Sequence, residues 1–217
     1  MRWWRRHSPT LTLQSQTAYA QWAKNYPPHA HNLLMEIEQA AMLQLMPDMA
    51  EKQILDLAGG SGRYGLIAKE KGARTVIETD NSLPMLRANP LEYRLASSML
   101  ALPFADASFD GLICALAIGH ISALEAAISE MARVLRPNGW GLISDFHPFA
   151  VLNGAKRTFT GSDGKTYAVE HYPHLYSAVL SAAAGSGLAI EAIAEPTIGG
   201  TPGSGAPLVI VYRMRLG

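Results

Sequence analysis

Residues 53–65, Gln-Ile-Leu-Asp-Leu-Ala-Gly-Gly-Ser-Gly-Arg-Tyr-Gly, decide the fold of this chain. The apolar residues among positions 54–58 predict a buried strand, the glycines predict a tight turn, and residues 66–71 predict the helix that follows. Glycine lets the backbone come close to a ligand, and the unpaired N–H groups at the start of a helix face that ligand. The stretch therefore predicts a strand, a turn and a helix that together bind an anionic or polar molecule.

Two classes of ligand use such a turn. Gly60, Gly62 and Gly65 match the G-x-G-x-x-G pattern of dinucleotide sites, although a lone match is weak evidence. The run Asp56-x-Ala58-x-Gly60-x-Gly62 resembles the first motif of the class I S-adenosylmethionine-dependent methyltransferases, in which an acidic residue precedes alternating glycines. A pyrophosphate gains nothing from a carboxylate at Asp56, whereas the amino-acid end of S-adenosyl-L-methionine carries an ammonium group. The methyltransferase pattern is favoured, and an NAD-dependent oxidoreductase is the alternative.

Three other stretches resemble the same family. Residues 101–110 are closely similar to its A-L-P-F-x-D-x-S-F-D segment, residues 133–139 match its R-x-L-x-P-x-G segment, and residues 81–86 resemble its Ser-Pro-x-Met-Leu run. The chain departs from the family at Ala58, where glycine is usual, and at Ser98, where an aspartate usually binds the adenine amino group. These departures leave open a third interpretation, a methyltransferase-like protein that binds the cofactor without turnover or has lost it.

The alternation of predicted strands and helices indicates an α/β fold. The resemblance implies a Rossmann-like, doubly wound, seven-stranded sheet of order 3-2-1-4-5-7-6, with strand 7 antiparallel and helices on both faces. We expect residues 1–48 to form an N-terminal helical lid segment, with a helix at about 30–46, and residues 49–217 to form the cofactor-binding domain. Alternating residues around Gly161–Gly164 predict a β-hairpin, inserted at about 149–173, that walls the substrate pocket.

The resemblance also implies which residues bind the cofactor. Asp80 ends the second strand, at 75–80, where a carboxylate can accept hydrogen bonds from both ribose hydroxyls. Glu78 is its competitor, and is otherwise expected to pair with a surface base. The adenine position falls to Ser98, or to Ser97 if the register shifts. The expected set is Tyr19, Tyr26, Asp56, Ala58, Gly59, Gly60, Gly62, Asp80, Asn81, Met85, Ser98, Met99 and Ala115.

Methyl transfer is an in-line displacement at a sulfonium, which requires positioning, exclusion of water and at most one base. His147 and His120 are the first candidates for that base because they lie near strand tips, and His171 can reach the pocket from the insertion. Each of them can instead be a histidine that only shapes the wall. If the nucleophile is already an anion, such as a carboxylate, no base is needed. Asp145 has no second carboxylate beside it in sequence, so no metal site is expected.

The amino-acid composition limits the classes of molecule that the protein is expected to bind. The 217 residues carry 18 basic and 18 acidic side chains, which disfavours nucleic acid, and no apolar stretch is long enough to cross a membrane. The single cysteine, Cys114, cannot form an internal disulfide, so we expect a cytoplasmic protein, either a monomer or a homodimer. Relatives of this length methylate quinone-ring precursors, carrier-protein-bound carboxylates and natural products. The balanced charge favours a small, largely apolar acceptor, methylated on oxygen, nitrogen or carbon.

Overall fold

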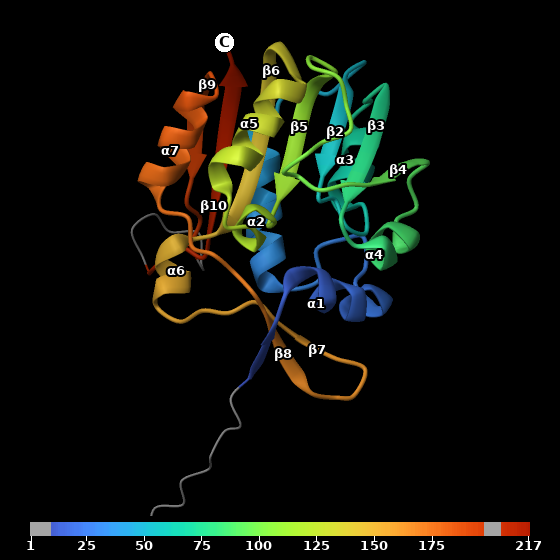
Figure 1. Cartoon of the computed structure of the whole chain (residues 1–217), viewed down its shortest axis with the longest axis vertical. Helices are drawn as coiled ribbons and strands as arrows, with labels where there is room; N and C mark the ends of the chain where they lie inside the picture. Colours follow the sequence, from blue (N-terminus) through green and yellow to red (C-terminus); the bar gives the residue numbers. More distant parts are fainter. Residues whose placement is uncertain (1–9, 198–204) are drawn as a thin grey trace, which may run out of the picture.

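A seven-stranded mixed sheet forms the centre of the computed structural model, which describes residues 10–197 and 205–217 (Figure 1). Its strands are β2 (Gln53–Leu57), β3 (Thr75–Asp80), β4 (Tyr93–Ala96), β5 (Phe109–Ala115), β6 (Leu135–Phe146), β9 (Leu188–Ala194) and β10 (Val209–Leu216). They lie in the order β4-β3-β2-β5-β6-β10-β9, and β10 runs antiparallel to both of its neighbours. This is the predicted strand order, and the predicted fold class is confirmed.

Helices cover both faces of the sheet. On one face, α2 (Leu33–Leu45) and α3 (Arg63–Glu70) share an apolar core with Ile54, Ile113 and Leu142. On the other face, α5 (Leu124–Val134) and α7 (Tyr176–Gly185) share a core that includes Leu55 and Leu112. Adjacent strand residues therefore serve opposite cores, as the two-residue period of a strand requires. The short helix α4 (Leu83–Ala88) contacts β3 and β4.

The N-terminal segment and the hairpin meet at the carboxyl ends of the parallel strands (Figure 1). The elements concerned are β1 (Leu11–Leu13), α1 (Ser15–Trp22), η1 (Ala23–Asn25), α6 (Pro148–Leu152), β7 (Thr158–Thr160) and β8 (Thr166–Val169). β1 pairs in parallel with β8 and completes a second sheet of order β1-β8-β7. Ala18 and Trp22 of α1 pack against Phe159 of β7. We call this unit of α1 and the small sheet the roof.

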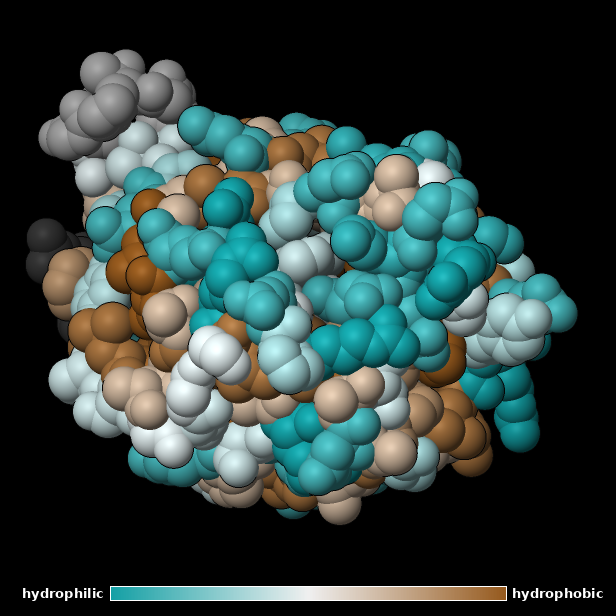
Figure 2. All heavy atoms as spheres, turned by 90° about the horizontal axis from the view of Figure 1, so that it is seen from above, coloured by the Kyte–Doolittle hydropathy of each residue, from teal (hydrophilic) through white to brown (hydrophobic). Residues whose placement is uncertain are grey.

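Figure 2 shows the end of the molecule that lies opposite the roof. Polar residues gather over the middle of that face, and apolar residues lie in smaller groups between them. Open α/β sheets bind ligands outside the carboxyl ends of their strands, which is the end that the roof covers. The fold therefore directs the search for a site to the space between the sheet and the roof.

Several element boundaries differ from the sequence predictions. β5 stops at Ala115, before the end of the apolar run, because Leu116 has a left-handed φ of 53° and residues Ile118–His120 form the short helix η2. The spacing Ser122-x-x-Glu125 predicts a capping box at the start of a helix. This prediction is wrong, since α5 begins at Leu124 and has no side-chain cap at Ala123. β1 was not predicted, because three residues show no periodicity and their partner strand lies far along the chain.

Arg133 connects two of the stretches that resemble the family, residues 101–110 and residues 133–139. Its guanidinium donates to the carbonyl oxygens of Leu102 (2.9 Å) and Phe104 (2.7 Å) and pairs with Asp106 (2.9 Å) and Glu130 (2.7 Å). Glu130 in turn accepts the Leu102 N–H at 2.7 Å. The end of α5 thus fixes the loop that leads into β5.

Arg133→Ala is expected to lower the free energy of unfolding by roughly 2 kcal/mol, because it removes several charge-assisted hydrogen bonds that the loop cannot replace. Urea denaturation measures this. Arg87→Ala, which removes an exposed arginine, is the control and should change the free energy by less than about 0.5 kcal/mol. Equal effects of the two substitutions would show that Arg133 does not hold the loop.

Candidate functional site

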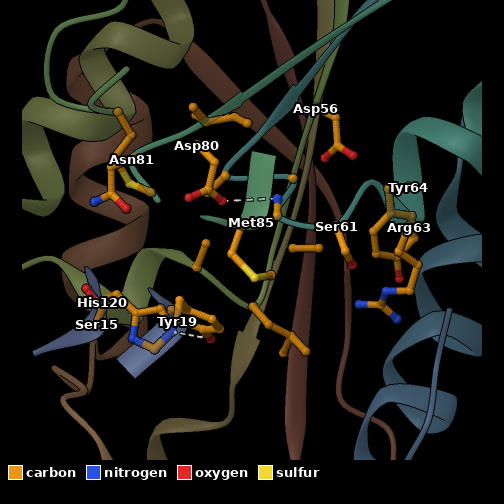
Figure 3. Close-up of a pocket in the computed structure, with 18 of the residues that line it drawn as sticks. Ser15, Tyr19, Asp56, Ser61, Arg63, Tyr64, Asp80, Asn81, Met85 and His120 are labelled. Atoms are coloured by element: carbon orange, nitrogen blue, oxygen red, sulfur yellow. Dashed lines mark hydrogen bonds between the residues drawn. The ribbon is translucent and has the colours of Figure 1, made fainter. Parts of the chain in front are cut away.

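A cavity of about 900 Å³, including its open mouth, lies between the sheet and α1 (Figure 3). All of the predicted cofactor residues line it except Gly62. Ser97, the alternative to Ser98, lines it as well, and the residues that line it without having been predicted are Ser15, Leu57, Ser61, Arg63, Tyr64, Leu116, Ala117, Ile121 and Arg157. His120 is the candidate base that lines it.

The turn after β2 has the left-handed backbone that its glycines permit. Ala58, Gly60 and Gly62 have φ of 54°, 59° and 92°. Ala58 therefore takes the conformation of the family's usual glycine, at a cost on the order of 1 kcal/mol for a residue with a Cβ. Gly62 points away from the cavity, because an added Cβ would lie 2.6 Å from Oδ1 of Asn89. Its role is to shape the turn.

Asp56 and Glu78 lie together beneath this turn. A Cβ built on Gly59 would lie 2.8 Å from Oδ2 of Asp56 and 2.0 Å from Oε2 of Glu78. Oδ2 of Asp56 accepts the Gly65 N–H at 2.7 Å, and burial raises the pKa of Asp56 to about 7. Burial and the nearby Asp56 raise the pKa of Glu78 well above its usual range. The expectation that Glu78 pairs with a surface base is wrong, because its side chain is fully buried.

Asp80 lies at the tip of β3, facing the cavity (Figure 3). Its two oxygens accept the N–H groups of Gly60 (3.0 Å) and Ser82 (2.7 Å). Burial raises its pKa to about 6, although these hydrogen bonds favour the ionised form. The carboxylate therefore couples the glycine turn to the start of α4, and both of its oxygens keep acceptor capacity for a ligand.

Two serines line the cavity beyond β4. Oγ of Ser98 accepts the Leu100 N–H at 3.2 Å, so this hydroxyl is already engaged within its own loop. Oγ of Ser97 is buried and has no hydrogen-bond partner in the described part of the chain. Ser97 is thus the hydroxyl without a partner, while Ser98 keeps its O–H and a second lone pair, so the choice between the two registers stays open.

The three candidate bases have different surroundings. In His120, Nδ1 donates to the Glu170 carbonyl (2.9 Å), so Nε2 accepts from the Tyr19 hydroxyl at 3.0 Å. Burial lowers the pKa of His120 to about 3, which keeps the ring neutral. Neither His147 nor His171 lines the cavity. The structure therefore does not bring the three together at one site.

His147 and His171 have partners outside the cavity. Nδ1 of His147 accepts the Phe149 N–H (3.2 Å) and caps α6, while Nε2 contacts Tyr176 and Glu195. Nε2 of His171 lies 3.8 Å from Oδ2 of Asp145, and burial lowers the pKa of His171 to about 4. The sequence analysis placed His147 at a strand tip, but the direction of its ring could not be predicted from that position.

Two buried arginines in the lining were missed by the sequence analysis. Arg63 opens α3 and pairs with the buried Glu38 of α2 at 2.8 Å, and its place directly after the glycine turn was a usable signal. Arg157 precedes β7 in the hairpin, and 8% of its surface is exposed. Nothing in the local sequence distinguishes Arg157 from the exposed Lys156 beside it.

Within 10–197 and 205–217, no group of three or more histidine, cysteine, aspartate or glutamate side chains is arranged to hold a metal ion. In the same ranges, no helix has both the length and the apolar character that crossing a membrane requires.

Comparison with known proteins places this geometry in a family. A family model described as a methyltransferase domain matches residues 55–143. The chain is similar to a demethylmenaquinone methyltransferase of Thermus thermophilus, with 36% identity over 115 residues, 49% of this chain and 52% of that protein. It is also similar to a malonyl-[acyl-carrier protein] O-methyltransferase of Xylella fastidiosa, with 29% identity over 163 residues, 70% of this chain and 54% of that protein. The chain thus spans about half the length of these curated relatives.

Solved structures agree with the sequence comparisons on the fold. An S-adenosylmethionine-dependent methyltransferase from Mesorhizobium loti superposes with a TM-score of 0.69 at 20% identity, over 82% of this chain and 97% of that chain. The family of these proteins implies S-adenosylmethionine as the cofactor. The matched residues 55–143 run from β2 into β6 and contain the glycine turn, Asp80 and both serines of the cavity. Residues 55–143 of this chain thus match a methyltransferase domain, on the fold of the S-adenosylmethionine-dependent methyltransferases.

Proposed function

We propose that this protein transfers a methyl group from S-adenosylmethionine to a small-molecule acceptor. The observation that carries the proposal is that one cavity joins the left-handed glycine turn after β2 to the Asp80 carboxylate at the tip of β3. A nucleoside with an amino-acid tail needs both features, a diol acceptor and a turn that lets the tail approach the backbone.

The cavity residues fit this cofactor. Asp80 offers acceptor oxygens for the ribose hydroxyls, and Asp56 offers a carboxylate near the turn for the ammonium group. The unpartnered hydroxyl of Ser97 offers a hydrogen bond to the adenine edge. Met85 lies across the turn, since a Cβ on Gly60 would be 2.9 Å from its Cε, and supplies an apolar surface there. The ribose, the ammonium group and the adenine therefore each have a counterpart in the lining.

Once bound, S-adenosylmethionine supplies a methyl group on a positively charged sulfur. The protein's part is to align the acceptor with that group and to exclude water. Tyr19 of α1 and Tyr26, which follows η1, line the cavity from the roof. Tyr19 is fixed there by its hydrogen bond to His120. We assign covering of the cofactor to these two rings, in keeping with the lid expected of residues 1–48.

The acceptor class is narrowed by the relatives only in part. Their names describe methyl transfer to demethylmenaquinone and to malonyl-[acyl-carrier protein]. The first acceptor is a quinone-type ring and the second is a carboxylate, so the two differ in the atom that is methylated. For this chain we propose a small organic acceptor.

The two alternative functions have less support. In the classic dinucleotide fold the strands follow the order 3-2-1-4-5-6, whereas β10 here is an antiparallel strand inserted between β6 and β9. A degenerate site was suggested by Ala58 and Ser98. Ala58 nevertheless takes the left-handed conformation, and Ser97 provides the free hydroxyl. Both departures are thus compatible with a working site.

Calorimetric titration with S-adenosylhomocysteine and with NAD tests this proposal. S-adenosylhomocysteine should bind with a dissociation constant on the order of micromolar, and Asp80→Ala should weaken it about tenfold or more through lost charge-assisted hydrogen bonds. Asp48→Ala, which removes an exposed carboxylate, is the control and should bind like the wild type. Preferential binding of NAD, or no binding of either ligand, would overturn the proposed function.

Binding of S-adenosylhomocysteine should also weaken as the pH falls. Burial raises the pKa of Asp56 to about 7 and that of Asp80 to about 6. A ligand that needs the ionised carboxylates must displace the protons bound to them. For each carboxyl that is protonated, the affinity should therefore fall about tenfold for every pH unit below the pKa of that carboxyl. Calorimetry from about pH 8 to about pH 5 measures the slope.

The same pKa values predict that the weaker binding at low pH is not caused by unfolding of the protein. Carboxyls whose folded pKa is raised stabilise the folded state at low pH and lose that contribution as the pH rises through about 6 to 7. These groups therefore do not promote unfolding over the acidic part of the titration, which thermal unfolding can verify. An affinity that stays constant across the range would show that neither carboxylate contacts the ligand.

A further inference from the structure

Arg157 brings a positive charge into the cavity from the hairpin. Its guanidinium donates to the carbonyl of Leu116 at 3.3 Å and to the hydroxyl of Tyr26 at 2.8 Å. Its central carbon lies 5.5 Å from the centre of the Tyr19 ring and 5.6 Å from that of Trp22. All four contacts are to uncharged groups, and the side chain is almost fully buried.

No carboxylate in the described ranges lies within ion-pair distance of Arg157, whereas the other buried arginine, Arg63, pairs with Glu38 at 2.8 Å. Asp145 feels the charge of Arg157, but burial still raises the pKa of Asp145 to about 7, so it is only partly ionised at neutral pH. Burying a cation without an ion pair is costly, since the side chain has lost its water and Asp145 and Glu38 offset this only from beyond ion-pair distance. A ligand anion would remove that cost.

The cofactor's own carboxylate has another cation closer to its expected place. Arg63 directly follows the glycine turn, and Figure 3 shows it beside Ser61 on the Asp56 side of the cavity. Tyr19, against which Arg157 lies, is on a different side, with His120. The hydrogen bond to Leu116 also puts Arg157 just past the end of β5 rather than at β2. Both arginines lie near Tyr26 and Glu38, and Arg157 also borders Tyr19. We assign the cofactor's carboxylate to Arg63 and the Tyr19 side of the cavity to Arg157.

The lining also lacks a free neutral base on this side. His120 is the histidine in the described lining, and both of its ring nitrogens are engaged, with Glu170 and Tyr19. Asp56 and Asp80 line the parts of the cavity assigned above to the cofactor. His171 lies against His120, with ring centres 5.8 Å apart, but outside the lining. An acceptor that must give up a proton would therefore find no free base in the lining itself, whereas an acceptor that arrives ionised needs none.

We infer that Arg157 binds an oxygen anion of the methyl acceptor, so that the acceptor is an acid already ionised at neutral pH, such as a carboxylic acid or an acidic enol. This inference rests on the proposed function and names the substrate class of the same site. An electron pair of the acceptor forms the bond to the methyl carbon while the carbon–sulfur bond breaks and its pair stays on sulfur. An anion and a sulfonium become two neutral groups, and no proton has to move.

The test compares ionised probes with neutral analogues of similar shape. Protein saturated with S-adenosylhomocysteine is titrated calorimetrically with 4-hydroxybenzoate and 4-hydroxybenzamide, and with 1,3-cyclohexanedione and cyclohexanone. The variants are Arg157→Gln, Arg157→Lys and, as a matched control, Lys156→Gln, which removes the exposed neighbouring charge. S-adenosylhomocysteine is titrated alone into each variant, which separates cofactor binding from acceptor binding.

The wild type and Lys156→Gln should bind at least one anion about tenfold more tightly than its neutral analogue. Arg157→Gln should lose that preference, and Arg157→Lys should keep it with weaker binding, because an ammonium lacks the planar fork of a guanidinium. Affinity for S-adenosylhomocysteine should stay within about threefold in all variants. Whichever anion is preferred then tells whether the acceptor resembles a carboxylate or an enolate.

Three results would overturn the inference. The first is a wild type that binds no anion better than its neutral analogue. The second is an Arg157→Gln variant that keeps the preference. The third is a loss of S-adenosylhomocysteine affinity in Arg157→Gln and Arg157→Lys, which would assign the arginine to the cofactor, either at its carboxylate or through the two tyrosines that cover it. Failure of S-adenosylhomocysteine to bind the wild type is a separate result, and it would reject the proposed function itself.

Discussion

The buried carboxyl pair of Asp56 and Glu78 is the constraint around which the site is built. A Cβ at Gly65 would lie 1.7 Å from Oε1 of Glu78, and one at Gly59 would lie 2.0 Å from Oε2. A side chain at either position would force Glu78 out of its place, so glycine there lets α3 and the turn close over β2 and β3 with the carboxyl pair beneath them. The glycine pattern that identifies the site from sequence thus reflects the packing of these acids as much as the approach of a ligand.

The sheet was predictable because its signals are local. Each central strand is a short apolar run beside a turn, and the family motifs fix the order in which the strands lie. Glu78 was misjudged because alternation implies a solvent-exposed face, whereas a doubly wound sheet buries both faces. β1 and Arg157 were missed because their surroundings are created by segments distant in the chain. No local pattern encodes such contacts.

Charge inside the cavity is separated in a way that the overall composition hides. Equal numbers of acidic and basic residues favoured a largely apolar acceptor. The lining instead has carboxyls at the tips of β2 and β3 and an arginine without a counter-ion past the end of β5. A positively charged sulfur and an anionic acceptor would thus each meet the opposite charge on its own side of the cavity.

The parallel pairing of β1 with β8 also bears on how the protein folds. Leu11 pairs with Tyr167, so the roof joins the beginning of the described chain to a hairpin near its end. Contacts between distant segments form slowly, because the intervening chain must first be ordered. During synthesis the glycine turn and β2 to β5 emerge well before the hairpin, so the cavity stays open to solvent until β8 has been made. Completion of the active site is therefore among the last steps of folding.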